Sequence, residues 1–120
     1  MKRALLVLLP LAALVVASPP AAHGLLVRAV PAPGSAVHGS PAEVTLSFSQ
    51  ALEREFSAAQ VLDANGKTVG TTDKRAATGD ARLLRVLLPP LAPGSYSVKW
   101  RVLSEDGHVT SGGFSFDVEP

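Results

Sequence analysis

Apolar and polar residues alternate with a period of two in three segments of the chain, 43–49, 94–102 and 113–118. Successive side chains of a β-strand point to opposite sides, so this alternation predicts strands with one buried face. The residues expected on the buried faces are Val44, Leu46 and Phe48, then Tyr96, Val98, Trp100 and Val102, and finally Phe114, Phe116 and Val118. These three strands form the framework of the predicted fold.

Weaker strand signals lie between them at 25–30, 59–62, 67–70 and 82–88, and only the stretch at 51–59 could form a short helical turn. Turn sequences such as Asn-Gly and Pro-Gly separate the strands, because their residues tolerate turn conformations. About seven short strands in a chain of this length predict an all-β, immunoglobulin-like Greek-key β-sandwich. We expect Trp100 to pack between its two sheets.

The first 22 residues have the layout of a secretory signal peptide. Two basic residues precede an apolar run at 4–17, and small residues follow it. Such a run is too short to span a hydrocarbon core about 30 Å thick. Cleavage after Ala22 leaves a mature domain of residues 23–120 that begins with His23, whereas cleavage five residues earlier leaves Ser18 first. We therefore expect a periplasmic protein, and the sequence does not decide between the two cleavage sites.

The composition of the expected mature domain narrows its function. Without Lys2 and Arg3, nine basic side chains stand against ten acidic ones, a balance that gives no electrostatic footprint for nucleic acid. No later segment is long and apolar enough to embed the mature protein in a membrane. The chain has no cysteine, and its single methionine is Met1. A Cu(I) site, which needs soft sulfur ligands, is therefore not expected.

Three histidines are the candidates for chemistry: His23, His38 and His108. His108 follows Asp106 by two residues, and in an extended segment side chains two apart point to the same side. The simpler interpretation is a loop in which Asp106 caps a turn and His108 is merely solvated. His38 has no carboxylate or second histidine near it in sequence and is expected to lie in a surface loop.

An N-terminal histidine changes this balance, because its free amine and ring Nδ1 can chelate one ion. Together with Asp106 and His108, His23 would supply up to three nitrogens and one oxygen, a ligand set suited to tetragonal Cu(II). Cu(II) also stands at the top of the affinity order for divalent metals. Imidazole and amine must be deprotonated to bind, so the affinity should fall in acid.

With these residues the chain resembles the CopC-like periplasmic copper-resistance proteins. The resemblance covers the whole mature chain, from Ala22-His23 and the Pro31 to Ser35 turn, through the strand at 44–49, to a long block at 93–108 that ends in Ser104-Glu105-Asp106-Gly107-His108. It implies a seven-stranded sandwich that binds Cu(II) through His23, Asp106 and His108. It further implies a role in copper tolerance or uptake, often with a CopD-like inner-membrane copper transporter.

Three functions remain open on this sequence. The first is a Cu(II) carrier or buffer without catalysis. The second is a histidine-chelate copper oxidoreductase, although the hard Asp106 ligand would favour Cu(II) over Cu(I) and impede redox cycling. The third is an adhesion-type sandwich in which His23 and His108 are unrelated. Titration with Cu(II) separates the third from the first two.

Overall fold

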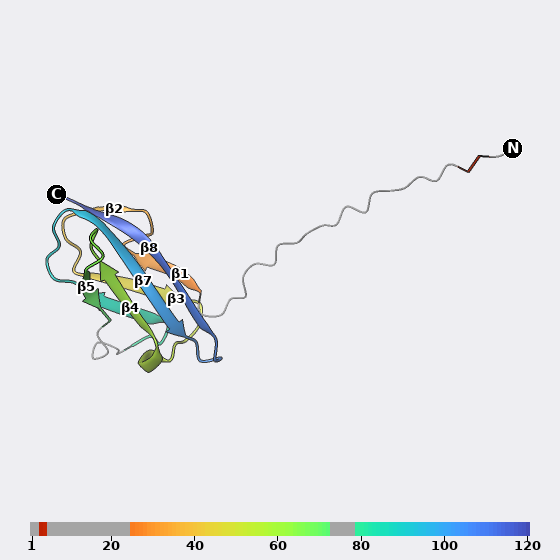
Figure 1. The fold of residues 1–120 in the computed structure, drawn as a ribbon. Coiled ribbons are helices and arrows are strands. Elements are labelled where there is room, and N and C mark those ends of the chain that lie inside the picture. Colours follow the sequence, from red (N-terminus) through yellow and green to blue (C-terminus); the bar gives the residue numbers. More distant parts are fainter. Residues whose placement is uncertain (1–2, 5–24, 73–78) are drawn as a thin grey trace.

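Two β-sheets pack face to face in the computed structural model, which describes residues 3–4, 25–72 and 79–120 (Figure 1). One sheet has the strand order β1-β3-β6 and the other β2-β8-β7-β4-β5. The strands are β1 (Leu26–Val30), β2 (Ala36–His38), β3 (Glu43–Phe48), β4 (Ala58–Leu62), β5 (Thr68–Thr71), β6 (Leu83–Leu87), β7 (Gly94–Leu103) and β8 (Val109–Glu119), with the 3₁₀ helix η1 (Arg54–Phe56) between β3 and β4. The predicted all-β sandwich is confirmed, with eight strands.

The core lies between the two sheets, where their inward side chains meet. Its buried apolar residues are Ala29, Val44, Leu46, Phe48, Leu52, Ala59, Val61, Leu84, Val86, Tyr96, Val98, Val102, Phe116 and Val118. The period-two alternation correctly identified the buried faces of β3, β7 and β8, because one face of each strand is covered by the opposite sheet. Phe114, also expected on such a face, packs against the core while partly exposed.

Trp100 packs against the core from its edge rather than at its centre. The indole is partly buried, and its ring meets the ring of Phe48 edge to face, with centroids 5.3 Å apart and an interplanar angle of 77°. On the neighbouring strand a Cβ added to Gly112 would lie 2.5 Å from Trp100 Cζ2. The indole can therefore lie against β8 at this point because Gly112 has no side chain.

Two differences from the sequence-based prediction concern β2 and β8. The three-residue β2 has no alternation to reveal it and exists because it pairs in parallel with the end of β8, through His38 and Glu119 among others. His38 is exposed as expected, but it ends this strand instead of lying in a loop. β8 begins at Val109, four residues earlier than predicted, because ladder pairing with β7 continues through the glycines that obscure the pattern.

The predicted signal peptide, residues 1–22, lies outside the described residues except for residues 3 and 4. His23 lies outside them as well. Within the described part of the chain, no helix is long and apolar enough to cross a membrane.

Candidate metal centre

The turn between β7 and β8 carries the two candidate ligands that the structure describes. Ser104 N donates a hydrogen bond to His108 O at 2.9 Å, and Gly107 N donates to Ser104 O, also at 2.9 Å. Gly107 has φ = +88°, a conformation that a residue with a side chain adopts only at a cost.

Asp106 and His108 lie side by side in this turn. His108 Nδ1 is 3.3 Å from Asp106 Oδ1, and the same carboxylate oxygen accepts a hydrogen bond from the His108 backbone N–H at 3.3 Å. The Asp106 side chain is 32% exposed and the His108 side chain is 59% exposed. The two side chains therefore lie close together in a turn that Asp106 caps. Their proximity and the turn-capping role of the simpler interpretation coexist.

A short segment that continues β3 links this turn to the start of β1. Ser49 N donates to Leu25 O at 2.9 Å, and two residues later Ala51 O accepts from Glu105 N at 3.0 Å. The first residues of the described sandwich and the β7–β8 turn thus share one end of the molecule, opposite the end formed by β2 and the C-terminus (Figure 1). His23 itself lies outside the described residues, and it precedes Leu25 by two positions.

Two serines are buried at the end of β7, and the sequence analysis did not identify them. Ser57 Oγ accepts from Leu103 N at 3.0 Å and donates to Glu53 O at 2.8 Å. Ser104, 1% exposed, occupies the inward position after Val102 and begins the turn. The available signal was a serine that continues the apolar face of a strand, because such a serine must be buried where the strand leaves the core.

A second pair of histidine and carboxylate lies at the opposite end of the sandwich. His38 Nδ1 is 3.6 Å from Glu119 Oε2, and the His38 side chain is 82% exposed. Across the described ranges, no three His, Asp or Glu side chains gather into a set that could hold a metal ion. Each pair offers two donors, and a complete site at either end needs a further one.

The fold and this turn define a small β-sandwich with a histidine and a carboxylate converging at one end. Residues 26–119 match the model of the CopC domain. Protein YobA of Escherichia coli (strain K12) is 35% identical over 99 residues, covering 82% of this chain and 80% of that protein. Copper resistance protein C of Pseudomonas syringae pv. tomato is 35% identical over 105 residues, covering 82% of each.

Among solved structures, the crystal structure of CopC from Methylosinus trichosporium OB3b superposes on this chain with a TM-score of 0.74. The two are 40% identical, and the match covers 82% of this chain and 95% of that one. The chain belongs to the CopC domain family, the family of copper resistance protein C. The resemblance seen in the sequence is confirmed.

Proposed function

We propose that this protein is a periplasmic, non-catalytic Cu(II) carrier or buffer that binds copper through His23, Asp106 and His108. The observation that supports it best is the shared end of the sandwich, where Leu25 and Glu105 are joined through the 49–51 segment. Two extended residues reach about 7 Å. A mature chain that begins at His23 therefore has its first residue within about 7 Å of Leu25, which lies at the same end of the sandwich as the Asp106–His108 turn.

The donors suit the proposed ion. Two ligands bound at right angles to one metal, each about 2 Å from it, are about 2.8 Å apart. His108 Nδ1 and Asp106 Oδ1 are 3.3 Å apart, so a small closing movement would bring both onto one ion. The His23 amine and ring would add a chelate, giving the nitrogen-rich tetragonal set that Cu(II) prefers.

A carrier role fits these donors better than redox catalysis. The Asp106 carboxylate is a hard anionic ligand, which stabilises Cu(II) relative to Cu(I). The 32% and 59% exposure of the two side chains would leave bound copper open to exchange with a partner. Copper resistance protein C among its relatives supports a role in copper tolerance. A CopD-like inner-membrane transporter is the partner that we propose for the transfer.

Replacing each exposed histidine in turn tests this function. His108→Ala should weaken Cu(II) binding at least about 100-fold, since loss of a metal's outer-shell partner alone costs about 10- to 100-fold. His38→Ala is the matched control, because it removes an exposed histidine beside a carboxylate at the other end. It should leave the affinity unchanged. Isothermal titration of the exported protein measures both, and equal affinities for the two variants would place the site elsewhere.

A further inference from the structure

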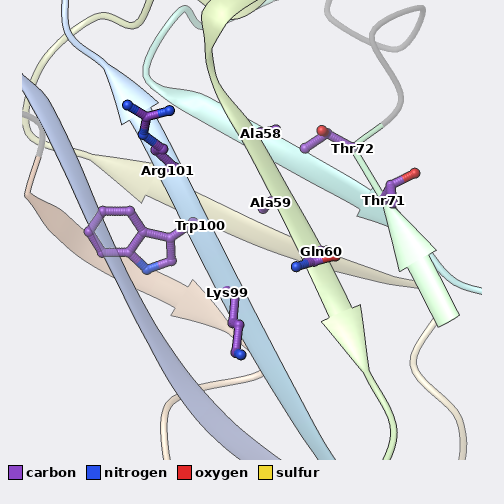
Figure 2. Close-up of a pocket in the computed structure, with 8 residues that line it drawn as sticks. All are labelled: Ala58, Ala59, Gln60, Thr71, Thr72, Lys99, Trp100 and Arg101. Atoms are coloured by element: carbon purple, nitrogen blue, oxygen red, sulfur yellow. The ribbon is translucent and has the colours of Figure 1, made fainter. Parts of the chain in front are cut away.

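The outer face of the five-stranded sheet carries an open groove that the copper chemistry does not use (Figure 2). Residues of β4, β5 and β7 line it, and its volume is about 300 Å³. This is the lower end of the range for ligand pockets, about 300–1,000 Å³. Strands β7 and β4 lie inside the sheet, so their backbone groups are already paired, whereas β5 is its edge strand. Recognition over β4 and β7 therefore comes from side chains.

The sheet register places five side chains around this groove. Arg101 pairs with Ala58, Lys99 pairs with Gln60, and Gln60 in turn pairs with Thr71 on β5. Directly paired residues point to the same face of a sheet. The neighbours of Lys99 and Arg101 along β7 belong to the inward face, so these five side chains lie on the outer one. Figure 2 shows Gln60 between Lys99 on one side and Thr71 on the other.

The described side chains around the groove carry positive charge. Lys99 and Arg101 are both exposed, and neither forms an ion pair with the part of the chain that the structure describes. The Gln60 side-chain oxygen accepts a hydrogen bond from the Thr68 hydroxyl at 3.3 Å, so its amide nitrogen is the group that remains to donate. Ala58 opposite Arg101 is small and leaves the space open. Every polar group that faces the groove from these positions can donate a hydrogen bond.

We propose that this groove docks an extended acidic segment of a partner protein, with carboxylates at alternate positions. Lys99 and Arg101 are two residues apart on one strand, about 7 Å, which is also the spacing of alternate side chains in an extended peptide. Toward the β7–β8 turn, Val109 pairs with Leu103, two residues beyond Arg101, and Phe56 precedes Ala58 by two residues. Their apolar side chains are 53% and 70% exposed. A free dicarboxylate would leave that apolar surface uncovered, whereas a protein segment covers it. This proposal does not depend on copper binding.

A capped peptide with two Glu residues at alternate positions, flanked by Ala and Leu, is the probe. It is titrated at low salt into the metal-free exported protein, and backbone amide shifts are followed by NMR. We expect saturable shifts centred on residues 58–60 and 99–101, and no saturation with the same peptide carrying Gln for Glu. The double variant Lys99→Gln/Arg101→Gln should weaken binding by about tenfold or more, equivalent to about 1.4 kcal/mol, because two charge-assisted contacts are lost.

The matched control is Arg28→Gln/Arg85→Gln, which removes the same charge from the outer face of the other sheet. It should change the affinity less than about twofold, because those arginines lie outside the groove. Equal weakening by the two double variants would reduce the effect to general charge attraction and overturn the proposal. Free glutarate binding as tightly as the peptide would overturn it as well, because the groove would then be a small-anion site.

Discussion

The two ends of this sandwich present nearly the same pair of side chains in different surroundings. At one end His108 Nδ1 is 3.3 Å from an Asp106 oxygen, and at the other His38 Nδ1 is 3.6 Å from a Glu119 oxygen. Both histidines are exposed, and each is next to a glycine with positive φ, Gly107 or Gly39. Judged by the pair alone, either end could hold a metal ion.

The difference lies in what stands beside each pair. Near Asp106–His108, hydrogen bonds through Ser49 and Ala51 tie the turn to Leu25, the first described residue of the sandwich. Beside His38 runs the C-terminal strand, whose Glu119 O accepts from Gly39 N at 2.9 Å. A histidine next to a carboxylate is therefore weak evidence for a metal site. The proposed site depends on the fold bringing a third donor to the same end.

The largest effect should come from blocking the amine of His23. A first residue offers ring and amine as a chelate, and the second bond of a chelate forms at high effective concentration. An acetyl group, or a residue left in front of His23, converts that amine into a poorly donating amide. We expect Cu(II) affinity to fall about 1,000-fold, within the 10²–10⁴ range of linked binding, as measured by competition with a Cu(II) chelator.

The comparison requires proteins identical from His23 onward, with intact mass confirming the first residue. Thermal unfolding of the metal-free domain should be the same in both, because the block adds nothing to the core. Equal Cu(II) affinity of the free and blocked proteins would contradict chelation by the amine and ring of His23. The two ends of the sandwich would then differ only in the local geometry of their pairs.

A smaller effect on Cu(II) binding is expected from neutralising Asp106. Asp106→Asn should weaken Cu(II) binding about tenfold, or about 1.4 kcal/mol, because an anionic ligand is lost. The amide oxygen can still accept from the His108 N–H, so the turn should be retained. Glu119→Gln is the matched change at the other end and should have no effect. Calorimetric titration of both variants with Cu(II) at one pH measures these affinities. A loss of affinity with Glu119→Gln comparable to that with Asp106→Asn would contradict the proposal that Asp106 is a ligand.

The sequence predicted the parts of the fold in which burial dictates the residue pattern. Val44, Leu46 and Phe48 alternate because one face of β3 is covered by the opposite sheet. The short β2 escaped prediction because only Val37 of its three residues packs against the core, and because it depends on parallel pairing with β8, a contact between distant parts of the chain. The start of β8 was missed because Gly112 and Gly113 carry no side chain to show the alternation.

For the candidate site, the sequence indicated which two side chains lie together but left their geometry open. Asp106 and His108 were singled out by residue type and spacing, with an extended segment and a capped turn both open, and the structure has the capped turn. The hydrogen bonds through Ser49 and Ala51 could not have been foreseen, since they join segments far apart in sequence. The role of His23 stays a prediction, because that residue lies outside the described part of the chain.

The smallest effect on copper, and the sharpest comparison of the two ends, should come from alanine at the paired glycines. Gly107 has φ = +88° and Gly39 has φ = +78°, and at either position an added Cβ would meet no atom within 4 Å. The change therefore introduces backbone strain without a steric clash. Gly107→Ala and Gly39→Ala should each lower the free energy of unfolding by about 1 kcal/mol, which is the cost of the left-handed conformation for a residue with a side chain.

Their effects on copper should differ, because only Gly107 lies between two proposed ligands. Relief of the strain would shift the turn and alter the 3.3 Å separation of His108 Nδ1 and Asp106 Oδ1. Gly107→Ala should thus weaken Cu(II) binding several-fold, whereas Gly39→Ala should leave it unchanged at the same loss of stability. Thermal melts of the metal-free proteins verify the match in stability before titration. If both variants bind Cu(II) as the unmodified protein does, the geometry of the Asp106–His108 turn does not set the affinity.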